Sequence, residues 1–545
     1  MCGIAGFCNF KEDFEENTDY WNFRLEKMRA VLAHRGNDAR GRFLKKHIGL
    51  SHSRLAIRDI LCGDQPMTRT HNGYDYTICY NGEIYNTDEL IPELSENGFV
   101  CSTTSDTEVI LYAYIHWGAD FVNRLNGIFA FAIWDAAKSR LLLYRDRVGV
   151  KPLFYAIRGD SLVFGSEPKA CFAHPAVKPE LDKQGLQELL AIGPAHTSGL
   201  SLFKDLFEVL PGHFMIYSRD GLHDETYWEL TSWEHTESYR DTVAHTRFLV
   251  EDAIKRQMVS DVPVCTFLSG GIDSSIVTAI AANYMNTHGK TLNTFSFDFK
   301  DNDRYFKANA FQPERDLPYV NRMLEEYETA HSYLECDENS LFKALFAAVD
   351  AKDMPGMTDV DSSLLYFCSL VSRKNKVALT GECADEIFGG YPWFYRKELL
   401  ERYGFPWSSD VAPRLALLRD DVGLELDLSG YQAFRYEESR SKAPLLYGEA
   451  GEDESRRIIG YLNIKWFMQT LLDRMDRTSM YSELEARVPF ADHRIIEYVF
   501  NVPWHMKYQN GVEKTLLRDA FSDVLPPELC LLYTSPSPRD RTRSR

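Results

Sequence analysis

A regular alternation of short apolar runs and helical patterns across residues 239–382 constrains the fold of this chain more than any other feature. The runs VPVCTFL, TLNTFSFDF, AHSYLEC and KVALTGE predict strands, and SSIVTAIAANYM, YVNRMLEEYE and SSLLYFCSLVSRK predict helices between them. Strands joined by helices form a parallel sheet that is covered on both faces. Ligands of such sheets bind at the carboxyl ends of the strands, so functional residues are expected there.

The loop FLSGGIDSS, residues 267–275, stands at one of these strand ends and runs into a helix. Backbone N–H groups and the helix dipole bind phosphate at such a junction. No GK[ST] sequence follows, so the loop is not the usual NTPase phosphate loop. Asp273 would repel phosphate unless Mg²⁺ lay between them. The sequence favours phosphate binding, and a plain Gly-Ser turn remains the alternative. The candidate ligand-binding residues are Ser269, Gly270, Gly271, Ser274 and Ser275.

A second acidic stretch, ALTGECADEIFGGY, follows the last predicted strand. It contains Glu382, Asp385 and Glu386 within five residues. Their position at the carboxyl end of a parallel strand indicates a metal-binding or general-base role. The alternative is a solvated first helical turn, where acidic side chains favour the helix dipole.

The first half of the chain has a different pattern. TICYNGEIYN, IFAFAIWD, RLLLYRD, KPLFYAI and LVFGSE follow at short intervals with polar or glycine turns between them, which is typical of an antiparallel meander. Helices are predicted near WNFRLEKMRAVLAHR and DTEVILYAYIHWG. The turn-rich segment 211–233 is the expected domain boundary.

The chain begins MCGIAGF, and this start permits two interpretations. If Met1 is removed, Cys2 has both a thiol and a free α-amine, whose ordinary pKa is about 8. Such a residue can serve as nucleophile and base together. Alternatively, Cys2 is a small apolar residue on the first strand.

Composition narrows the classes of function. The net charge of −19 argues against a nucleic-acid partner. Eleven scattered cysteines without a C-x-x-C pair predict reduced thiols rather than disulfides or a zinc site. No apolar run approaches the ~20 residues that span a bilayer, and no secretion signal is recognisable. These features predict a soluble, cytoplasmic protein that binds neither membrane nor nucleic acid.

Cys2 at the N-terminus and SGGIDSS in the second half occur together with HRGND, HSRLAI, YNGEIYN, SDTEV, RDRVGVKP, GECADEIFGGYPW, EARVPF and VEKTLLRDAF. In this order the motifs resemble the bacterial glutamine-hydrolysing asparagine synthetases. The resemblance implies an N-terminal-nucleophile αββα glutaminase over residues 1–215, a linker over 216–235 and an α/β ATP-pyrophosphatase domain over 236–529. Residues 530–545 depart from the family pattern, which suggests a truncated chain ending in a disordered or artefactual tail.

The resemblance also implies roles for residues of the first half. Cys2 would attack the glutamine amide, with the Asn81 side chain and the Gly82 N–H as oxyanion hole. Arg54 would bind the glutamine carboxylate, and Glu83 and Asp106 its α-ammonium. From the residues alone, Arg54 could be a surface charge, Asp106 a helix N-cap and Asn81-Gly82 a hairpin turn.

For the second half, the resemblance implies ATP-dependent conversion of aspartate to asparagine through β-aspartyl-AMP, with release of AMP and pyrophosphate. Ammonia would arrive through an internal tunnel. Asp273 and Asp385 would bind Mg²⁺, Glu382 would assist catalysis, and Lys514 would stabilise pyrophosphate unless it is an ordinary exposed helix lysine. Arg487 would lie near the aspartate and phosphate subsite unless it forms a buried ion pair. The other expected ATP-binding residues are Phe267, Ser269, Gly270, Gly271, Ser274, Phe297, Thr380 and Gly381.

Alternatives to this reading remain. HRGND has Asn37 where the family usually has proline, which would loosen a loop near the glutamine site. A related ligase such as a β-lactam synthetase often lacks the N-terminal Cys. A non-catalytic nucleotide-binding relative should lack some site residues, and a tRNA-modifying ATP-pyrophosphatase would need a basic face. Glutamine, aspartate and ATP are the expected small-molecule partners, and the resemblance leaves a homodimer open.

Overall fold

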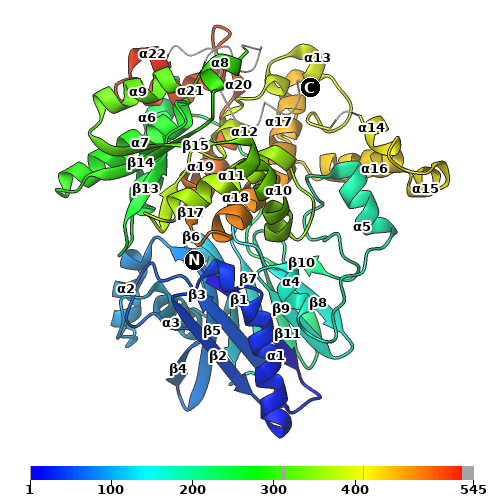
Figure 1. Cartoon of the computed structure of the whole chain (residues 1–545). Helices are drawn as coiled ribbons and strands as arrows, with labels where there is room; N and C mark the ends of the chain where they lie inside the picture. Colours follow the sequence, from blue (N-terminus) through cyan, green and yellow to red (C-terminus); the bar gives the residue numbers. More distant parts are fainter. Residues whose placement is uncertain (1, 308–314, 409, 531–545) are drawn as a thin grey trace.

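The computed structural model describes residues 2–307, 315–408 and 410–530. Two bodies lie one above the other: the N-terminal half, blue to cyan, forms the lower one, and the C-terminal half, green to red, forms the upper one (Figure 1). The expected removal of Met1 and nearly all of the expected tail, residues 531–545, lie outside the described residues.

The lower body contains two six-stranded antiparallel sheets. The first has the order β10-β8-β9-β1-β3-β2 and the second β12-β11-β7-β6-β5-β4. The strands of the first sheet are β1 (Cys2–Asn9), β2 (Ala39–Lys45), β3 (Ile48–Arg54), β8 (Phe154–Arg158), β9 (Ser161–Gly165) and β10 (Phe207–Glu208). Those of the second are β4 (Met67–His71), β5 (Tyr74–Ile84), β6 (Gly127–Asp135), β7 (Arg140–Arg145), β11 (His213–Ser218) and β12 (Gly221–Thr226).

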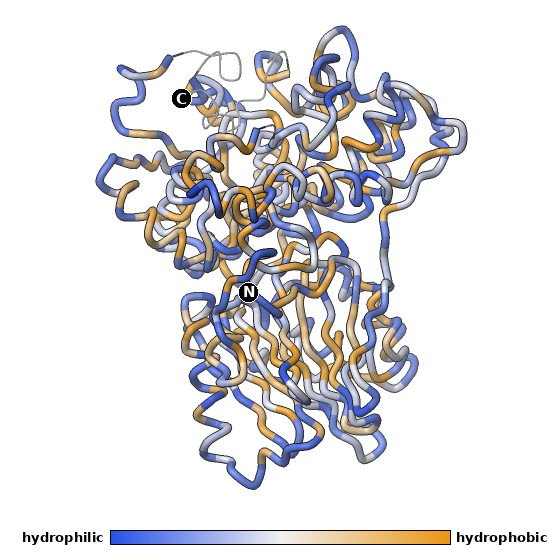
Figure 2. The backbone as a smooth tube through the Cα atoms, turned by 90° about the vertical axis from the view of Figure 1, so that its right-hand side faces the viewer, coloured by the Kyte–Doolittle hydropathy of each residue, from blue (hydrophilic) through white to orange (hydrophobic). Residues whose placement is uncertain are grey.

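The two sheets are stacked face to face with helices outside. Ile4 and Leu50 of the first sheet share a core with Ala132 and Leu143 of the second. The tube of Figure 2 shows long hydrophobic stretches in the lower body. Helix α1 (Thr18–Ala30) packs against the first sheet, and α3 (Asp106–Trp117) packs against the second beside α2 (Thr87–Glu96). The expected αββα architecture is therefore confirmed.

The structure differs from the expected domain boundary. The predicted linker 216–235 includes the end of β11 and all of β12, which pair in register from His213 opposite Thr226 to Ser218 opposite Gly221. The exposed, polar side chains of β12 hid this strand, because it lies at the edge of its sheet. The N-terminal sheet thus extends to Thr226, beyond the predicted end of the domain at residue 215.

The upper body is built around a five-stranded sheet of order β15-β14-β13-β16-β17, in which every neighbouring pair is parallel. Its strands are β13 (Val264–Phe267), β14 (Leu292–Phe299), β15 (Thr329–Cys336), β16 (Val377–Leu379) and β17 (Glu485–Arg487). The larger helices are α6 (Tyr239–Arg256), α7 (Ile272–Thr287), α9 (Leu317–Glu326), α10 (Glu338–Lys352), α11 (Thr358–Val371), α16 (Leu428–Arg440), α17 (Glu452–Leu462), α18 (Met468–Met480) and α19 (His493–Asn501).

Shorter helices complete the fold. They are α4 (Pro168–Phe172), α5 (Lys183–Gln187), α8 (Asn302–Tyr305), α12 (Ala384–Phe388), α13 (Lys397–Leu400), α14 (Ala412–Leu415), α15 (Asp420–Leu426), α20 (Trp504–Lys507), α21 (Thr515–Ala520) and α22 (Pro527–Cys530).

Both faces of the parallel sheet are buried, as the alternating pattern predicts. Successive strand residues point to opposite faces. Val377 belongs to the core that contains α6 and α7, whereas its neighbour Ala378 packs with Phe367 and Cys368 of α11. The expected α/β domain is confirmed, and β17 is an added strand that its three-residue length concealed.

All eleven cysteines lie in the described part of the chain, and none forms a disulfide. Across the same residues, no helix has both the length and the apolar character needed to cross a membrane.

Candidate active sites

The first candidate site lies where the two antiparallel sheets meet. Cys2 opens β1 opposite Arg54 of β3, and its backbone N–H donates to Asn81 Oδ1 of the second sheet at 2.9 Å. Only 7% of Cys2 is exposed. Burial raises the pKa of its thiol, although the nearby Leu55 backbone and Arg54 oppose the shift. A thiol in this position needs a base to become nucleophilic.

Asn81 and Gly82 lie within β5, paired with Ala130 and Phe129 of β6, so the hairpin-turn interpretation is wrong. Asn81 is fully buried, and its Nδ2 has no hydrogen-bond partner in the described structure. A buried amide donor without an acceptor is costly unless a ligand satisfies it. This orphan donor on the residue that contacts Cys2 is what an oxyanion hole requires.

Gly82 is required by its backbone. Its φ of +154° is one that side chains with a Cβ rarely adopt, and a Cβ there would lie 2.1 Å from the Ile128 carbonyl oxygen. Any larger residue would displace the strand beside Cys2.

Arg54 is 5% exposed and is therefore not a surface charge. Its guanidinium donates to the carbonyl oxygens of Ile60 and Asp59 at 3.1 and 2.6 Å and to Asp64 Oδ1 at 2.9 Å. The loop 58–64 thus folds around the guanidinium. The role of Arg54 in binding a glutamine carboxylate stays a prediction.

Two buried carboxylates lie near each other beside β5. Asp106 Oδ2 accepts from the Tyr80 hydroxyl at 2.9 Å and from the Ile84 N–H at 3.0 Å, while Ser105 caps α3, so Asp106 is not an N-cap. Glu83 Oε2 is buried without a hydrogen bond among the described residues. Burial and then the charge of Asp106 raise the pKa of Glu83 well above its ordinary value. Arg58 and Arg487 lie 4.0 and 3.7 Å from the Glu83 carboxylate and oppose this shift, and an α-ammonium would add a further cation.

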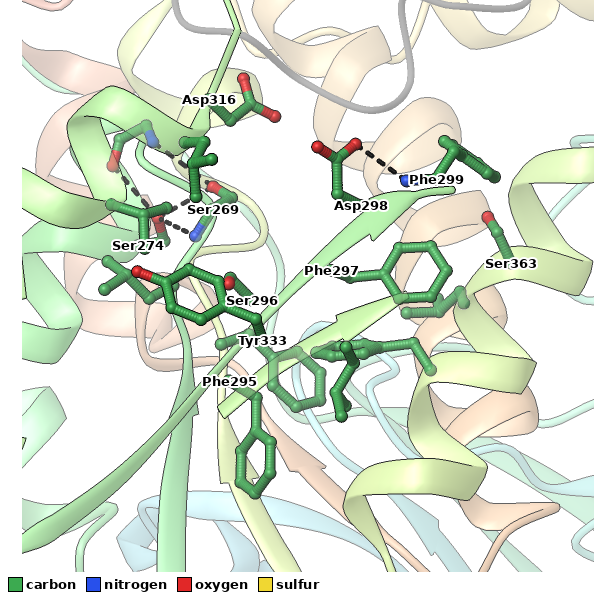
Figure 3. Close-up of a pocket in the computed structure, with 18 of the residues that line it drawn as sticks. Ser269, Ser274, Phe295, Ser296, Phe297, Asp298, Phe299, Asp316, Tyr333 and Ser363 are labelled. Atoms are coloured by element: carbon green, nitrogen blue, oxygen red, sulfur yellow. Dashed lines mark hydrogen bonds between the residues drawn. The ribbon is translucent and has the colours of Figure 1, made fainter. Parts of the chain in front are cut away.

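The second candidate site is a cavity of about 910 Å³ at the carboxyl ends of β13, β14 and β16 (Figure 3). The structure brings most of the predicted nucleotide residues to its wall. They are Phe267, Ser269, Gly271, Asp273, Ser274, Phe297, Thr380, Gly381, Glu382 and Asp385. Phe267 and Phe297 form one apolar side, each packed against the ring of Phe367.

The glycine loop is held in shape by its own serines. Ser269 Oγ and Ser274 Oγ are 2.9 Å apart, and Ser274 Oγ lies 3.1 Å from the Gly271 carbonyl oxygen, to which it donates. Gly270 has φ +82°, and a Cβ there would lie 2.7 Å from the Asp316 carbonyl oxygen. Helix α7 starts at Ile272, so its free N–H groups lie beside this loop. The loop therefore provides the anion-binding geometry expected from the sequence.

Lys514 joins the two predicted metal-binding residues. Its Nζ lies 2.7 Å from Asp273 Oδ2 and 2.5 Å from Asp385 Oδ1. The lysine is completely buried, so it is not an exposed helix lysine. Burial alone would lower the pKa of Lys514, but the two carboxylates outweigh it and raise the pKa. Burial raises the pKa of Asp273 although Lys514 opposes the shift.

These residues fit a divalent cation that is shared with phosphate. Asp273 Oδ1 is buried without a hydrogen-bond partner in the described structure. No group of three or more His, Cys, Asp and Glu side chains in residues 2–307, 315–408 and 410–530 is placed to hold a metal alone. Mg²⁺ commonly takes one or two carboxylates plus substrate phosphates, which agrees with Asp273 and Asp385 at this loop.

The two remaining acidic side chains of the stretch 382–386 lie in different cavities. Glu382 lines the cavity, whereas Glu386 lines a different cavity. Glu386 Oε1 accepts from the Tyr391 hydroxyl at 2.7 Å, and burial followed by the charge of Asp385 raises the pKa of Glu386 to about 8. A metal-binding role for Glu386 at the nucleotide cavity is therefore wrong.

Arg487 is a predicted site residue, and Arg474 is not. Arg487 is fully buried on β17, pairs with Glu485 at 2.5 Å and donates to the Gln257 carbonyl oxygen at 2.6 Å, outside the cavity. Arg487 thus forms the buried ion pair that was the alternative, and because it does not line this cavity, the expected position near the aspartate subsite finds no support here. Arg474 of α18 lines the cavity instead, 3.5 Å from Glu382. No periodic or glycine-rich signal marks Arg474 in the sequence.

A buried ion network connects the two sites. Arg35 donates from Nε to the Cys2 carbonyl oxygen at 3.1 Å and pairs with Glu167 at 2.9 Å and Asp476 at 2.8 Å. Asp476 also pairs with Lys151 at 2.8 Å. Asp476 and Arg474 both belong to α18. This helix therefore contacts the nucleotide cavity through Arg474 and, through Asp476 and Arg35, is linked to the backbone of Cys2. Asn37, where proline was expected, donates to Glu483 across the same junction.

Comparison with known proteins finds relatives for both halves of the chain. Residues 1–228 match the "Glutamine amidotransferase domain" model, and residues 245–531 match "Asparagine synthase". The chain is 48% identical to asparagine synthetase [glutamine-hydrolyzing] 3 of Bacillus subtilis, over 99% of this chain and 87% of that protein. The chain belongs to the asparagine synthase family. The expected family and both expected fold classes are therefore confirmed.

More distant relatives also match almost the whole chain. Asparagine synthetase [glutamine-hydrolyzing] 1 of B. subtilis is 29% identical over 96% of this chain and 85% of its own length. A protein of Penicillium rubens named amidase chyE is 30% identical over 97% of this chain and 87% of its own length. Proteins that align with almost the whole chain thus bear different names.

Proposed function

We propose that this chain converts aspartate to asparagine with ATP, using ammonia released from glutamine, through a β-aspartyl-AMP intermediate. The observation that carries this proposal is the buried Lys514–Asp273–Asp385 cluster at a phosphate loop, in one chain with a buried Cys2 and the orphan amide donor of Asn81. The first cluster suits cleavage of a nucleotide and the second suits acyl transfer.

The glutaminase reaction begins at Cys2. After removal of Met1, the free α-amine takes the thiol proton, and Sγ attacks the amide carbon of glutamine. Asn81 Nδ2 and the Gly82 N–H stabilise the negative oxygen that forms. The proton then passes to the leaving nitrogen, ammonia departs, and water hydrolyses the thioester to glutamate. Arg54 and the carboxylates of Glu83 and Asp106 orient the substrate through its carboxylate and ammonium.

The synthetase reaction takes place at the carboxyl ends of the parallel strands. The adenine ring lies in the apolar part of the cavity near Phe267 and Phe297, and the phosphates lie on residues 269–274. The β-carboxylate of aspartate attacks the α-phosphorus, and pyrophosphate leaves toward Lys514. Mg²⁺, held by Asp273 and Asp385, would neutralise phosphate charge when bound.

Ammonia completes the reaction. It attacks the acyl carbon of β-aspartyl-AMP, the bond to the AMP oxygen breaks, and Glu382 takes the proton that the nitrogen loses. The products are asparagine and AMP. The buried junction between the halves, which excludes bulk water around Arg35 and Asp476, supports internal transfer of ammonia rather than its release.

One assay tests the proposal. Purified protein is incubated with ATP, Mg²⁺ and aspartate, with glutamine or ammonium as nitrogen donor, and asparagine, AMP and pyrophosphate are measured. Equal amounts of the three products are expected with either donor. ADP and orthophosphate as first products would contradict the mechanism. Amide formation only on another carboxylic acid would indicate a related ligase instead.

A further inference from the structure

The guanidinium of Arg474 is buried in the nucleotide cavity with most of its donors unused. The side chain is 3% exposed. Its Nε and one terminal nitrogen, Nη1, are buried and make no hydrogen bond within the described residues, and Nη2 lies 3.5 Å from both carboxylate oxygens of Glu382. A buried guanidinium has five N–H donors, and leaving them unsatisfied is costly. The geometry therefore favours a ligand acceptor at this point.

The charge of the cavity wall makes Arg474 distinctive. Nine acidic residues line the cavity, and the cationic residues on the same described wall are Lys300, Arg315 and Arg474. Lys300 is exposed, and Arg315 lies 3.5 Å from Asp298. Lys514, next to the cavity, is already held by Asp273 and Asp385. Among the three cations of this described wall, Arg474 is thus the one that is almost completely buried, and two of its three guanidinium nitrogens make no hydrogen bond.

We propose that Arg474 binds a carboxylate of the acidic amino-acid substrate and so selects a dicarboxylic acid. This inference rests on the proposed function. In the proposed reaction, the nucleotide phosphates bind to the loop 269–274 at the N-terminus of α7 and to Lys514, which precedes α21. Arg474 comes from α18 and meets the cavity beside Glu382, where the acyl group must react. A guanidinium donates charge-assisted hydrogen bonds to a carboxylate, and the unused Nε–H and Nη1–H groups are separate donor positions for such a bond.

The test is steady-state kinetics of Arg474→Met and Arg474→Lys, measured as aspartate-dependent exchange of pyrophosphate into ATP. Loss of a charge-assisted hydrogen bond to the carboxylate should raise the KM for aspartate about 10- to 100-fold, while the KM for ATP changes little. Lysine should restore part of the loss, because it keeps the positive charge without the planar guanidinium. Arg322→Met is the matched control, since Arg322 pairs with Glu325 and Glu528 and does not line the cavity.

Chemical rescue separates a binding role from a structural one. In Arg474→Ala, added ethylguanidinium should lower the KM for aspartate toward the wild-type value and should not affect the wild-type protein. Glutaminase activity of each variant reports that the chain is folded. If the KM for ATP rises and the KM for aspartate does not, Arg474 serves the nucleotide and the inference is overturned.

The two proposals fail in different ways. In the first case, the wild-type protein activates aspartate, and Arg474→Met has the same KM for aspartate as the wild type. This result overturns the role of Arg474 alone. In the second case, the wild-type protein neither binds aspartate in calorimetry nor supports the exchange of pyrophosphate into ATP. This result overturns the proposed function as well.

Discussion

Replacing Asp476 with asparagine tests whether the buried ion network holds the two halves together. The Asp476 carboxylate is 2% exposed and lies 2.8 Å from both Arg35 and Lys151, whose side chains are fully buried. Asparagine keeps the shape of the side chain but removes its charge. Arg35 retains Glu167, whereas Lys151 has no other carboxylate within 4.0 Å in the described structure.

The expected loss of stability follows from Lys151, which would keep its buried charge without a carboxylate partner. Removing one partner of a buried ion pair costs about 3–5 kcal/mol, because the remaining charge stays desolvated. The asparagine oxygen can still accept one hydrogen bond, so we expect a loss near the lower limit, about 3 kcal/mol in the free energy of unfolding. Asp421→Asn is the control: Asp421 and its partner Arg419 are exposed, and such pairs contribute about 1 kcal/mol or less.

The pH dependence of this effect has a defined sign. Burial would raise the pKa of Asp476, but Arg35 and Lys151 outweigh it and lower the pKa below its ordinary value. A carboxylate with a lowered folded pKa stabilises the protein above its unfolded pKa, about 3.9, and loses this contribution as the pH falls further. The stability difference between wild type and Asp476→Asn should therefore be complete at pH 7 and shrink below about pH 4.

Two measurements check the prediction. Urea unfolding followed by fluorescence reports stability, and the ratio of asparagine formed to glutamate released reports ammonia transfer. We expect Asp476→Asn to lower both, with ammonium-dependent synthesis kept under conditions where the variant is folded. A change in stability no larger than that of Asp421→Asn, together with an unchanged ratio, would refute the reasoning.

Three further variants separate the two chemistries. Cys2→Ala should abolish glutamine-dependent asparagine formation and spare synthesis from ammonium; loss of both in a folded variant would contradict two separate sites. Gly82→Ala should lower glutaminase kcat at least about 10-fold, because a Cβ would meet the Ile128 carbonyl at 2.1 Å beside the oxyanion hole; normal glutaminase kinetics would argue against that role. Asp273→Asn should lower synthetase turnover about 100-fold or more and leave glutamine hydrolysis intact; unchanged synthesis would exclude metal binding by Asp273.

Much of the fold could be predicted because its signals are local. The strands β13, β14, β15 and β16 read as apolar runs between amphipathic helices, and the glycine loop marks the strand end where ligands bind. β12 and β17 were missed for different reasons. β12 is polar and forms a strand by pairing with β11 at the edge of its sheet. β17 is three residues long, and its register is set by pairing with β16.

Some residues of the candidate sites could also be predicted from local sequence signals, and others could not. Cys2 and the loop 269–274 are recognisable from their position in the chain. Arg487 and Arg474 are not, because both are single arginines in helical or short extended segments. Which of them faces the cavity depends on the packing of α18 and β17 against the sheet. The ordinary expectation that arginine is exposed is wrong for both, since each is at most 3% exposed.

Burial of so many charges at the junction has a physical consequence for the coupling of the sites. Arg35, Lys151 and Asp476 could not be kept in a dry interface unless each satisfied the others, so the network has one well-defined arrangement. Arg35 in that arrangement binds the carbonyl oxygen of Cys2 itself. A displacement of α18 would therefore move the backbone of Cys2, the proposed nucleophile, and the Arg474–Glu382 pair together. Coupling of glutamine hydrolysis to occupation of the nucleotide cavity requires this kind of shared element.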